Sequence, residues 1–221
     1  IDDSYSAALA HMNGADASTV FTDESGRAWT RAGNAQIDTA ESIFGGASAL
    51  FDGNGDYLTL PDSDDFYFNG DFTIDFRLRL NSNSAFRLFD QAGSSNQFLL
   101  DYNPASGWGL QVYGTGGLKI SGSWAWTPST GVWYHIALVR SGNDFKMFVD
   151  GTQIGSTLTD PDAIPNVAGT VYLGANNIGG SSLNGWLDEV RFSRGIARWT
   201  SNFTPRASEY SPGTMQESLM A

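Results

Sequence analysis

The sequence predicts an all-β fold in which two antiparallel sheets pack face to face. Three observations support this fold class. Apolar and polar residues alternate with a period of two along several stretches, whereas helical periodicity is nearly absent. Clusters of Gly, Asn, Asp, Ser and Pro separate these stretches, and Gly alone contributes 26 of the 221 residues. Hydrophobic residues make up 41% of the chain, which is enough for a sizeable core.

The predicted strands are short and follow one another along the chain. The clearest is DFTIDFRLRL, in which alternate positions from Phe72 to Leu80 are apolar. The run VWYHIALVR is apolar on both faces, as in a central strand. In DFKMFVDGTQIG the pair Asp150-Gly151 stands between two strand-like runs, which predicts a hairpin. Further strands are expected over residues 7–12, 47–51, 56–60, 86–90, 97–101, 109–113, 117–120, 171–174 and 186–193.

Asp188 is unusual in the last of these strands. Strict alternation places it on one face with Trp186, Val190 and Phe192, which are residues typical of a core. An unpaired buried carboxylate costs several kcal/mol, or its pKa rises until it is neutral. Asp188 is therefore expected to accept hydrogen bonds from backbone N–H groups, to pair with an arginine, or to bind a cation. The opposite face would carry Leu187, Glu189, Arg191 and Ser193.

The length favours one domain, because β sandwiches often reach this size as single units. We expect that domain to cover residues 1–204 and an irregular C-terminal tail to cover 205–221, where the chain becomes polar and rich in turn-forming residues. The tail would lie over the sandwich or lead to a further segment.

Composition excludes several kinds of partner. The 24 acidic residues outnumber the 12 basic ones and give a net charge of −12, so neither nucleic acid nor an anionic membrane is an expected partner. The chain has no cysteine, which excludes disulfides and thiol chemistry. No apolar run approaches the ~18–20 residues that span a bilayer. The excess acid indicates solubility or, more specifically, sites for a hard cation such as calcium.

Five stretches in a fixed order resemble a known family. They are ASALFDGNGDYLTLP, DFTIDFRLRL, GVWYHIALVRSGNDFKMFVDGTQIG, VYLGANN and LNGWLDEVRFSRGIAR. Their order is similar to that in the concanavalin A-like lectin/glucanase superfamily, in its laminin G-like, pentraxin-like branch. The resemblance covers about residues 7–204 and implies a concanavalin A-like jelly-roll sandwich. The segments ALFDGNGDYL and ARWTSNFTP are also similar to segments that are common in phage and marine microbial proteins.

The resemblance implies a structural calcium ion. In this family, calcium often lies between an aspartate on the last strand and an early loop of the type Asp-x-Ser-Gly. The corresponding residues here are Asp188 and, in the loop, Asp23, Ser25 and Gly26. The alternative is that Asp188 is a hydrogen-bonded structural residue without a metal. A second acidic stretch, FDGNGDYL, lacks the spacing of an EF-hand and is interpreted as a tight turn.

The sequence does not support an enzyme. Glucanases of the resembling fold use paired glutamates in the pattern Glu-x-Asp-x-x-Glu, and retaining hydrolysis needs two carboxyls ~5–5.5 Å apart. The five glutamates here lie at positions 24, 41, 189, 209 and 217, and no two have that spacing. His135 shares a predicted face with apolar residues and is interpreted as a core histidine.

Aromatic residues provide the candidate sugar site. Glycan recognition combines flat aromatic faces with polar groups for the hydroxyls. In GSWAWTPSTG, Trp124 and Trp126 are two positions apart and would lie on the same face of a strand. Trp108 and Tyr113 precede them in a glycine-rich region. The alternative is that these aromatic residues fill the core.

The sequence therefore predicts a non-catalytic, lectin-like domain that binds a glycan or polysaccharide and is stabilised by calcium. Binding of this kind is weak per site, so a multivalent or oligomeric arrangement is expected. The location would be extracellular or on a virion. The alternative function is a phage structural or decoration protein that docks on other virion proteins.

Overall fold

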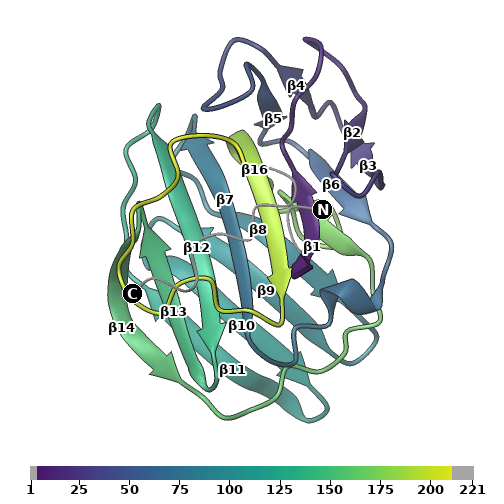
Figure 1. Cartoon of the computed structure of the whole chain (residues 1–221). Helices are drawn as coiled ribbons and strands as arrows, with labels where there is room; N and C mark the ends of the chain where they lie inside the picture. The colour runs from purple at the N-terminus through teal and green to yellow at the C-terminus, as the bar shows by residue number, and fades with distance from the viewer. Residues whose placement is uncertain (1–3, 211–221) are drawn as a thin grey trace.

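A computed structural model describes residues 4–210 and shows two antiparallel sheets packed face to face (Figure 1). One short 3-10 helix, η1 (Asp64–Phe66), interrupts the strands. The front sheet contains β1 (Ser6–Ala10), β4 (Gln36–Asp38), β5 (Ser48–Asp52), β7 (Phe72–Leu80), β12 (Trp133–Ser141), β13 (Asp144–Val149), β14 (Thr152–Thr159) and β16 (Asn184–Arg194). The back sheet contains β2 (Phe21–Thr22), β3 (Ala28–Ala32), β6 (Tyr57–Leu60), β8 (Phe86–Ala92), β9 (Gln97–Asn103), β10 (Gly107–Gly114), β11 (Gly117–Trp124) and β15 (Val171–Leu173).

The strand order brings distant parts of the chain together. The front sheet runs β14-β13-β12-β7-β16-β5-β4, and β1 pairs with the end of β16 beyond β5. The back sheet runs β11-β10-β9-β8-β15-β6-β3-β2. This arrangement confirms the predicted two-sheet sandwich. Within residues 4–210 there is no helix of the length and apolar character that crossing a membrane requires.

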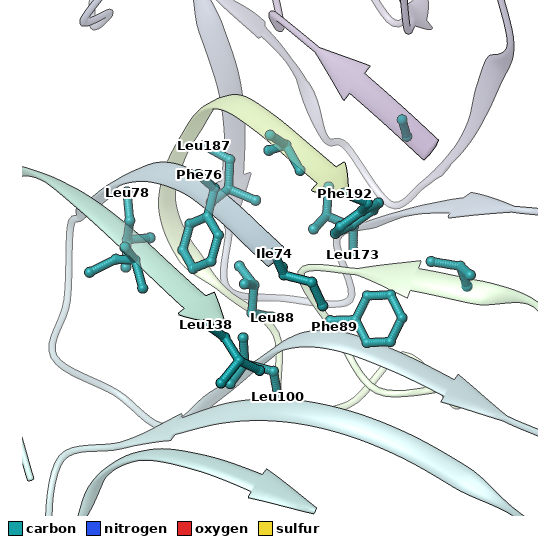
Figure 2. Packing of buried hydrophobic residues seen from close by; sticks show 14 of the residues in the cluster. Ile74, Phe76, Leu78, Leu88, Phe89, Leu100, Leu138, Leu173, Leu187 and Phe192 are labelled. Atoms are coloured by element: carbon teal, nitrogen blue, oxygen red, sulfur yellow. The ribbon is translucent and has the colours of Figure 1, made fainter. Parts of the chain in front are cut away.

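The core lies between the two sheets, where the apolar positions of each alternating strand meet (Figure 2). Burial of this apolar surface is the main force that holds the layers together. Figure 2 shows Ile74, Phe76, Leu78, Leu138, Leu187 and Phe192 of the front sheet close to Leu88, Phe89, Leu100 and Leu173 of the back sheet.

Each strand expected from the alternation is present, and so is the predicted hairpin. Asp150 and Gly151 both have positive φ, at 48° and 75°, which is the geometry that a two-residue turn between twisted strands requires. Three short strands near the N-terminus were not predicted. Over β2, β3 and β4 the chain is too short or too polar to alternate clearly.

The predicted faces of β16 are wrong because the strand contains a bulge. Glu189 has a φ of 50°, and the pairing of β16 with β7 changes register between Asp188 and Arg191. A bulge adds one residue to one strand, so the side chains beyond it change face. Asp188 therefore does not share a face with Val190. The core-facing residues of the strand are Leu187, Val190 and Phe192.

The C-terminal segment, residues 195–210, crosses the outer face of the front sheet (Figure 1). Trp199 and Phe203 stack with their ring centroids 4.0 Å apart and pack on apolar residues of β12 and β13. Tyr210 is buried farther along the same face. The part of the expected tail between residues 205 and 210 is irregular and lies over the sandwich, and residues 211–221 lie outside the described range.

Candidate glycan-binding pocket and buried carboxylates

The structure separates the four aromatic residues predicted to bind sugar. Trp108 and Trp124 are opposite each other on β10 and β11, and both are fully buried in the core. The indole N–H of Trp124 donates to the carbonyl of Ser156 at 3.0 Å. Trp126 is half-buried and stacks on Trp108. The predicted sugar platform of Trp124 and Trp126 is therefore wrong, because both residues pack in or against the core. Of the four predicted aromatic residues, only Tyr113 lines a described pocket.

Tyr113 lies in a pocket of about 280 Å³ on the back sheet. The β8–β9 turn forms one wall, and the loop after β15 contributes Asn177. Because Tyr113 pairs directly with Gln97, its ring is at the edge of this turn. The sequence identified QAGSSN and NNIGGSS only as turns, so their role in a pocket was missed. The lining residues are Ala92, Gly93, Ser94, Ser95, Asn96, Gln97, Tyr113 and Asn177.

A buried carboxylate holds the polar residues of this pocket in place. Asp90, which has no exposed surface, accepts hydrogen bonds from the side-chain amide of Gln97 at 2.7 Å and from the backbone N–H of Asn177 at 3.0 Å. Arg87 donates to the same carboxylate at 3.1 Å. Supporting hydrogen bonds of this kind reduce the entropy lost on binding. The phenol of Tyr113 is oriented by Gln111 at 3.1 Å.

A larger depression of about 570 Å³ lies beside β1 and η1 and is lined by two arginines, Arg27 and Arg194, of which Arg27 is already paired. Arg27 donates to Asp23, to Asp65 and to the carbonyl of Ala7. An arginine with every group engaged has little left for a ligand. We regard the smaller pocket as the better candidate for a sugar, because Asp90 holds its Gln97 and Asn177 in place beside the Tyr113 ring.

The four predicted calcium ligands do not fit an ion in this geometry. One oxygen of Asp23 accepts hydrogen bonds from the backbone N–H and hydroxyl of Ser25 and from the backbone N–H of Arg27, at 2.6–3.0 Å. The other oxygen accepts from the Arg27 guanidinium at 2.9 Å. A dication would have to displace these donors. Gly26 closes the turn with a φ of 81°.

Asp188 has partners of its own. It is fully buried, and one carboxylate oxygen accepts from the backbone N–H groups of Ile43 and Phe44, each at 3.2 Å. The other oxygen has no hydrogen-bond partner. Burial outweighs the two amide hydrogen bonds and raises the pKa of Asp188 to about 7. Of the outcomes expected from the sequence, the structure shows the contact with backbone N–H groups.

The calcium binding expected from the sequence can be tested directly by its effect on stability. Because the set of Asp23, Ser25, Gly26 and Asp188 does not fit, we expect the melting temperature of chelated protein to be unchanged by millimolar calcium. An ion at 100 times its Kd would add about 2.7 kcal/mol to the free energy of unfolding. A clear rise in melting temperature that Asp188→Asn abolishes would contradict this expectation.

Glu24 and Glu189, which follow the predicted ligands Asp23 and Asp188 in the sequence, both contact His11 just after β1. One ring nitrogen lies 3.2 Å from a carboxylate oxygen of Glu24, and the other contacts Glu189. Glu209 lies close enough that His11, Glu189 and Glu209 could together hold a metal ion. Imidazole and carboxylates suit zinc, but a protonated imidazole satisfies the same carboxylates. Sequence reasoning missed this cluster because its members lie far apart in the chain.

The His11 cluster predicts a pH-dependent contribution to stability. Burial lowers the pKa of His11, but the hydrogen bond to Glu189 and the charges of Glu189, Glu24 and Glu209 outweigh burial and raise it. The contribution is therefore fully present below the unfolded value of ~6.5 and lost as the pH rises through the folded pKa. Urea unfolding between pH 5 and 9 should show His11→Gln to be less stable than the parent mainly at the acidic end. A deficit independent of pH would contradict this assignment.

Comparisons with known proteins agree with the fold. Residues 52–197 match the model of the family described as "Concanavalin A-like lectin/glucanases superfamily". Domain 4 of AbnA, an extracellular arabinanase of Geobacillus stearothermophilus solved with arabinotriose, is 18% identical with a TM-score of 0.66, and the match covers 87% of this chain and 94% of that domain. A search of the curated proteins finds no match.

Two further solved structures contain the same fold within longer chains. The binding domain of Paraclostridial Mosquitocidal Protein 1 is 16% identical with a TM-score of 0.63, over 87% of this chain and 49% of that one. The sialidase of Trypanosoma rangeli is 16% identical with a TM-score of 0.59, over 86% of this chain and 30% of that one. Since the family model covers well over half of the sequence, the chain belongs to the concanavalin A-like lectin/glucanase superfamily.

Proposed function

We propose that this chain is a non-catalytic module that binds a glycan at the Tyr113 pocket. The observation that carries the proposal is the polar network around Asp90, which holds Gln97 and Asn177 beside an aromatic ring. Amides and hydroxyls can donate to and accept from sugar hydroxyls, and the ring can contact the apolar face of a sugar. A lectin-like sandwich, and a similar domain solved with arabinotriose, support the same interpretation.

The arrangement of the glutamates supports the non-catalytic part of the proposal. Glu24 and Glu189 approach each other only around His11. Glu189 is buried, and its second oxygen accepts from the backbone N–H of Tyr210 at 2.7 Å. Glu41 pairs with Arg79. Hydrolysis of a glycosidic bond needs two carboxyls that reach the bond from both sides. None of the glutamates in residues 4–210 lines the Tyr113 pocket.

Replacing Tyr113 by alanine should weaken glycan binding and leave the fold intact. The ring is half-buried at the pocket and outside the core, so its removal should cost little stability. Loss of an aromatic contact at a binding site costs about 1–2 kcal/mol, which corresponds to roughly a tenfold weaker Kd. A glycan array identifies the ligand, and isothermal calorimetry then compares the parent with the variant.

Tyr5→Ala is the matched control, because Tyr5 is a half-exposed tyrosine that lines the larger depression. It should bind the glycan as the parent does. Loss of binding in Tyr5→Ala, with Tyr113→Ala unaffected, would move the site to the other depression. Silence on the array together with co-purification on virions would favour the alternative function of a decoration protein.

The proposal includes the setting in which binding occurs. A pocket of about 280 Å³ is slightly smaller than most ligand sites, which measure ~300–1,000 Å³. It therefore contacts few sugar units, and its affinity per site is low. Several copies on one surface would raise the avidity. We place the module outside a cell or on a virion surface, where polysaccharides are exposed.

A further inference from the structure

The Tyr113 pocket contains no side chain that is charged at neutral pH. Its lining consists of two serines, three amide side chains, one phenol and two small residues. Each polar group is therefore neutral and suited to the hydroxyls of a sugar. A carboxylate or sulfate entering the pocket would find no cation for a charge-assisted hydrogen bond.

The positive charge of Arg87, behind the pocket, is already neutralised. Arg87 contacts the carboxylate of Asp90 at 3.1 Å, and its other terminal nitrogen lies 3.9 Å from a carboxylate oxygen of Asp101. Two carboxylates thus surround one guanidinium and leave a net negative charge. The chain as a whole carries −12. At physiological salt a charge acts over about 8 Å, and the Asp90 carboxylate lies 2.7 Å from the side-chain amide of Gln97 in the pocket lining, so its negative charge reaches the pocket.

We propose that the pocket selects an uncharged sugar residue and rejects sialylated, uronic-acid and sulfated glycans. The inference rests on the proposed glycan-binding function and adds the chemical class of the ligand. Rejection has two parts: an anionic group gains no cationic partner in the pocket, and it is repelled by the excess charge of Asp90 and Asp101. Discrimination of this kind depends on an unfavourable element as much as on favourable contacts.

The test uses pairs of glycans that differ by one charged group, such as an oligosaccharide with and without its terminal sialic acid or sulfate. We expect the uncharged member of each pair to bind at least about tenfold more tightly, with smaller discrimination at high salt. Equal or tighter binding of the charged members, abolished by Tyr113→Ala, would overturn the inference while the glycan-binding function stands. Binding of no glycan at all would overturn the function itself.

Asp101→Asn tests the electrostatic cause directly. Its side chain is 33% exposed and lies at the outer end of the Arg87 pair, so the variant should fold, which its melting temperature checks. We expect charged glycans to bind more tightly to Asp101→Asn than to the parent, because Arg87 is then less fully neutralised. Asp64→Asn removes the same charge from an exposed position outside the pocket and should leave the discrimination unchanged. Equal discrimination in Asp101→Asn and the parent would overturn the inference.

Discussion

Replacing Asp75 by alanine is expected to lower the free energy of unfolding by about 3–5 kcal/mol. Asp75 is fully buried between the front sheet and the C-terminal segment. It accepts hydrogen bonds from the Arg191 guanidinium at 3.0 and 3.3 Å and from the phenol of Tyr210 at 2.5 Å, and His135 lies 3.3 Å away. The variant leaves a buried guanidinium without this carboxylate, and breaking a buried pair on one side is the costly change.

The pH dependence of the loss distinguishes charge from packing. Burial acts to raise the pKa of Asp75, but the charge of Arg191 and the hydrogen bond from His135 hold it well below its usual range. The stabilisation is therefore present above the unfolded value of ~3.9 and lost as the pH falls through the folded pKa. Urea unfolding at pH 7 and pH 3 should show the deficit of Asp75→Ala shrinking in acid.

Tyr210→Phe is the matched control for this cluster, because it removes one hydrogen bond and keeps the charge pair. It should cost only about 1–2 kcal/mol. If Asp75→Ala proved no more damaging than Tyr210→Phe, the buried pair of Asp75 and Arg191 would not be the main source of the expected loss.

Periodicity was enough to predict the sandwich, since a period of two distinguishes a half-buried strand wherever it is long enough to repeat. Phe72–Leu80 shows this pattern over its whole length, and its apolar positions do face the core. The strands that escaped prediction are short and polar, and tertiary pairing creates them. Ala28–Ala32 is a strand because β6 and β2 lie on either side of it, and nothing in its own pattern indicates this.

The candidate site was predictable only in part, because the relevant information is spread over distant loops. Alternation along a strand correctly places Trp124 on one face of the strand, but it cannot say which face is turned to the core. The bulge at Glu189 has no glycine or proline to mark it, and it reverses the faces of half a strand. The Tyr113 pocket needs three segments that meet only through the pairing of β9 with β8 and β10 and of β8 with β15.

Replacing Asp188 by asparagine is expected to raise the stability of the protein relative to the parent as the pH increases from acid to alkaline. A carboxyl that titrates near pH 7 in the folded state and near ~3.9 in the unfolded state lowers the free energy of unfolding by about 4 kcal/mol above pH 7. Between these values the folded protein binds the proton more tightly, so stability falls as the pH rises. Below pH 4 both states are protonated and the effect vanishes.

Asparagine is the informative variant because it has the same shape and no charge. Its oxygen can accept from Ile43 and Phe44, while its amide nitrogen replaces the oxygen that has no partner. The amide nitrogen of the variant has no acceptor, which lowers its free energy of unfolding by about 1–3 kcal/mol. Because this cost is the same at every pH, it does not affect how the difference between variant and parent changes with pH. Denaturant titrations from pH 4 to 8.5 should therefore show the difference between variant and parent growing in favour of asparagine up to about pH 7 and staying constant above it. Parallel curves would mean that the carboxylate of Asp188 is as well solvated or paired in the folded protein as in the unfolded chain.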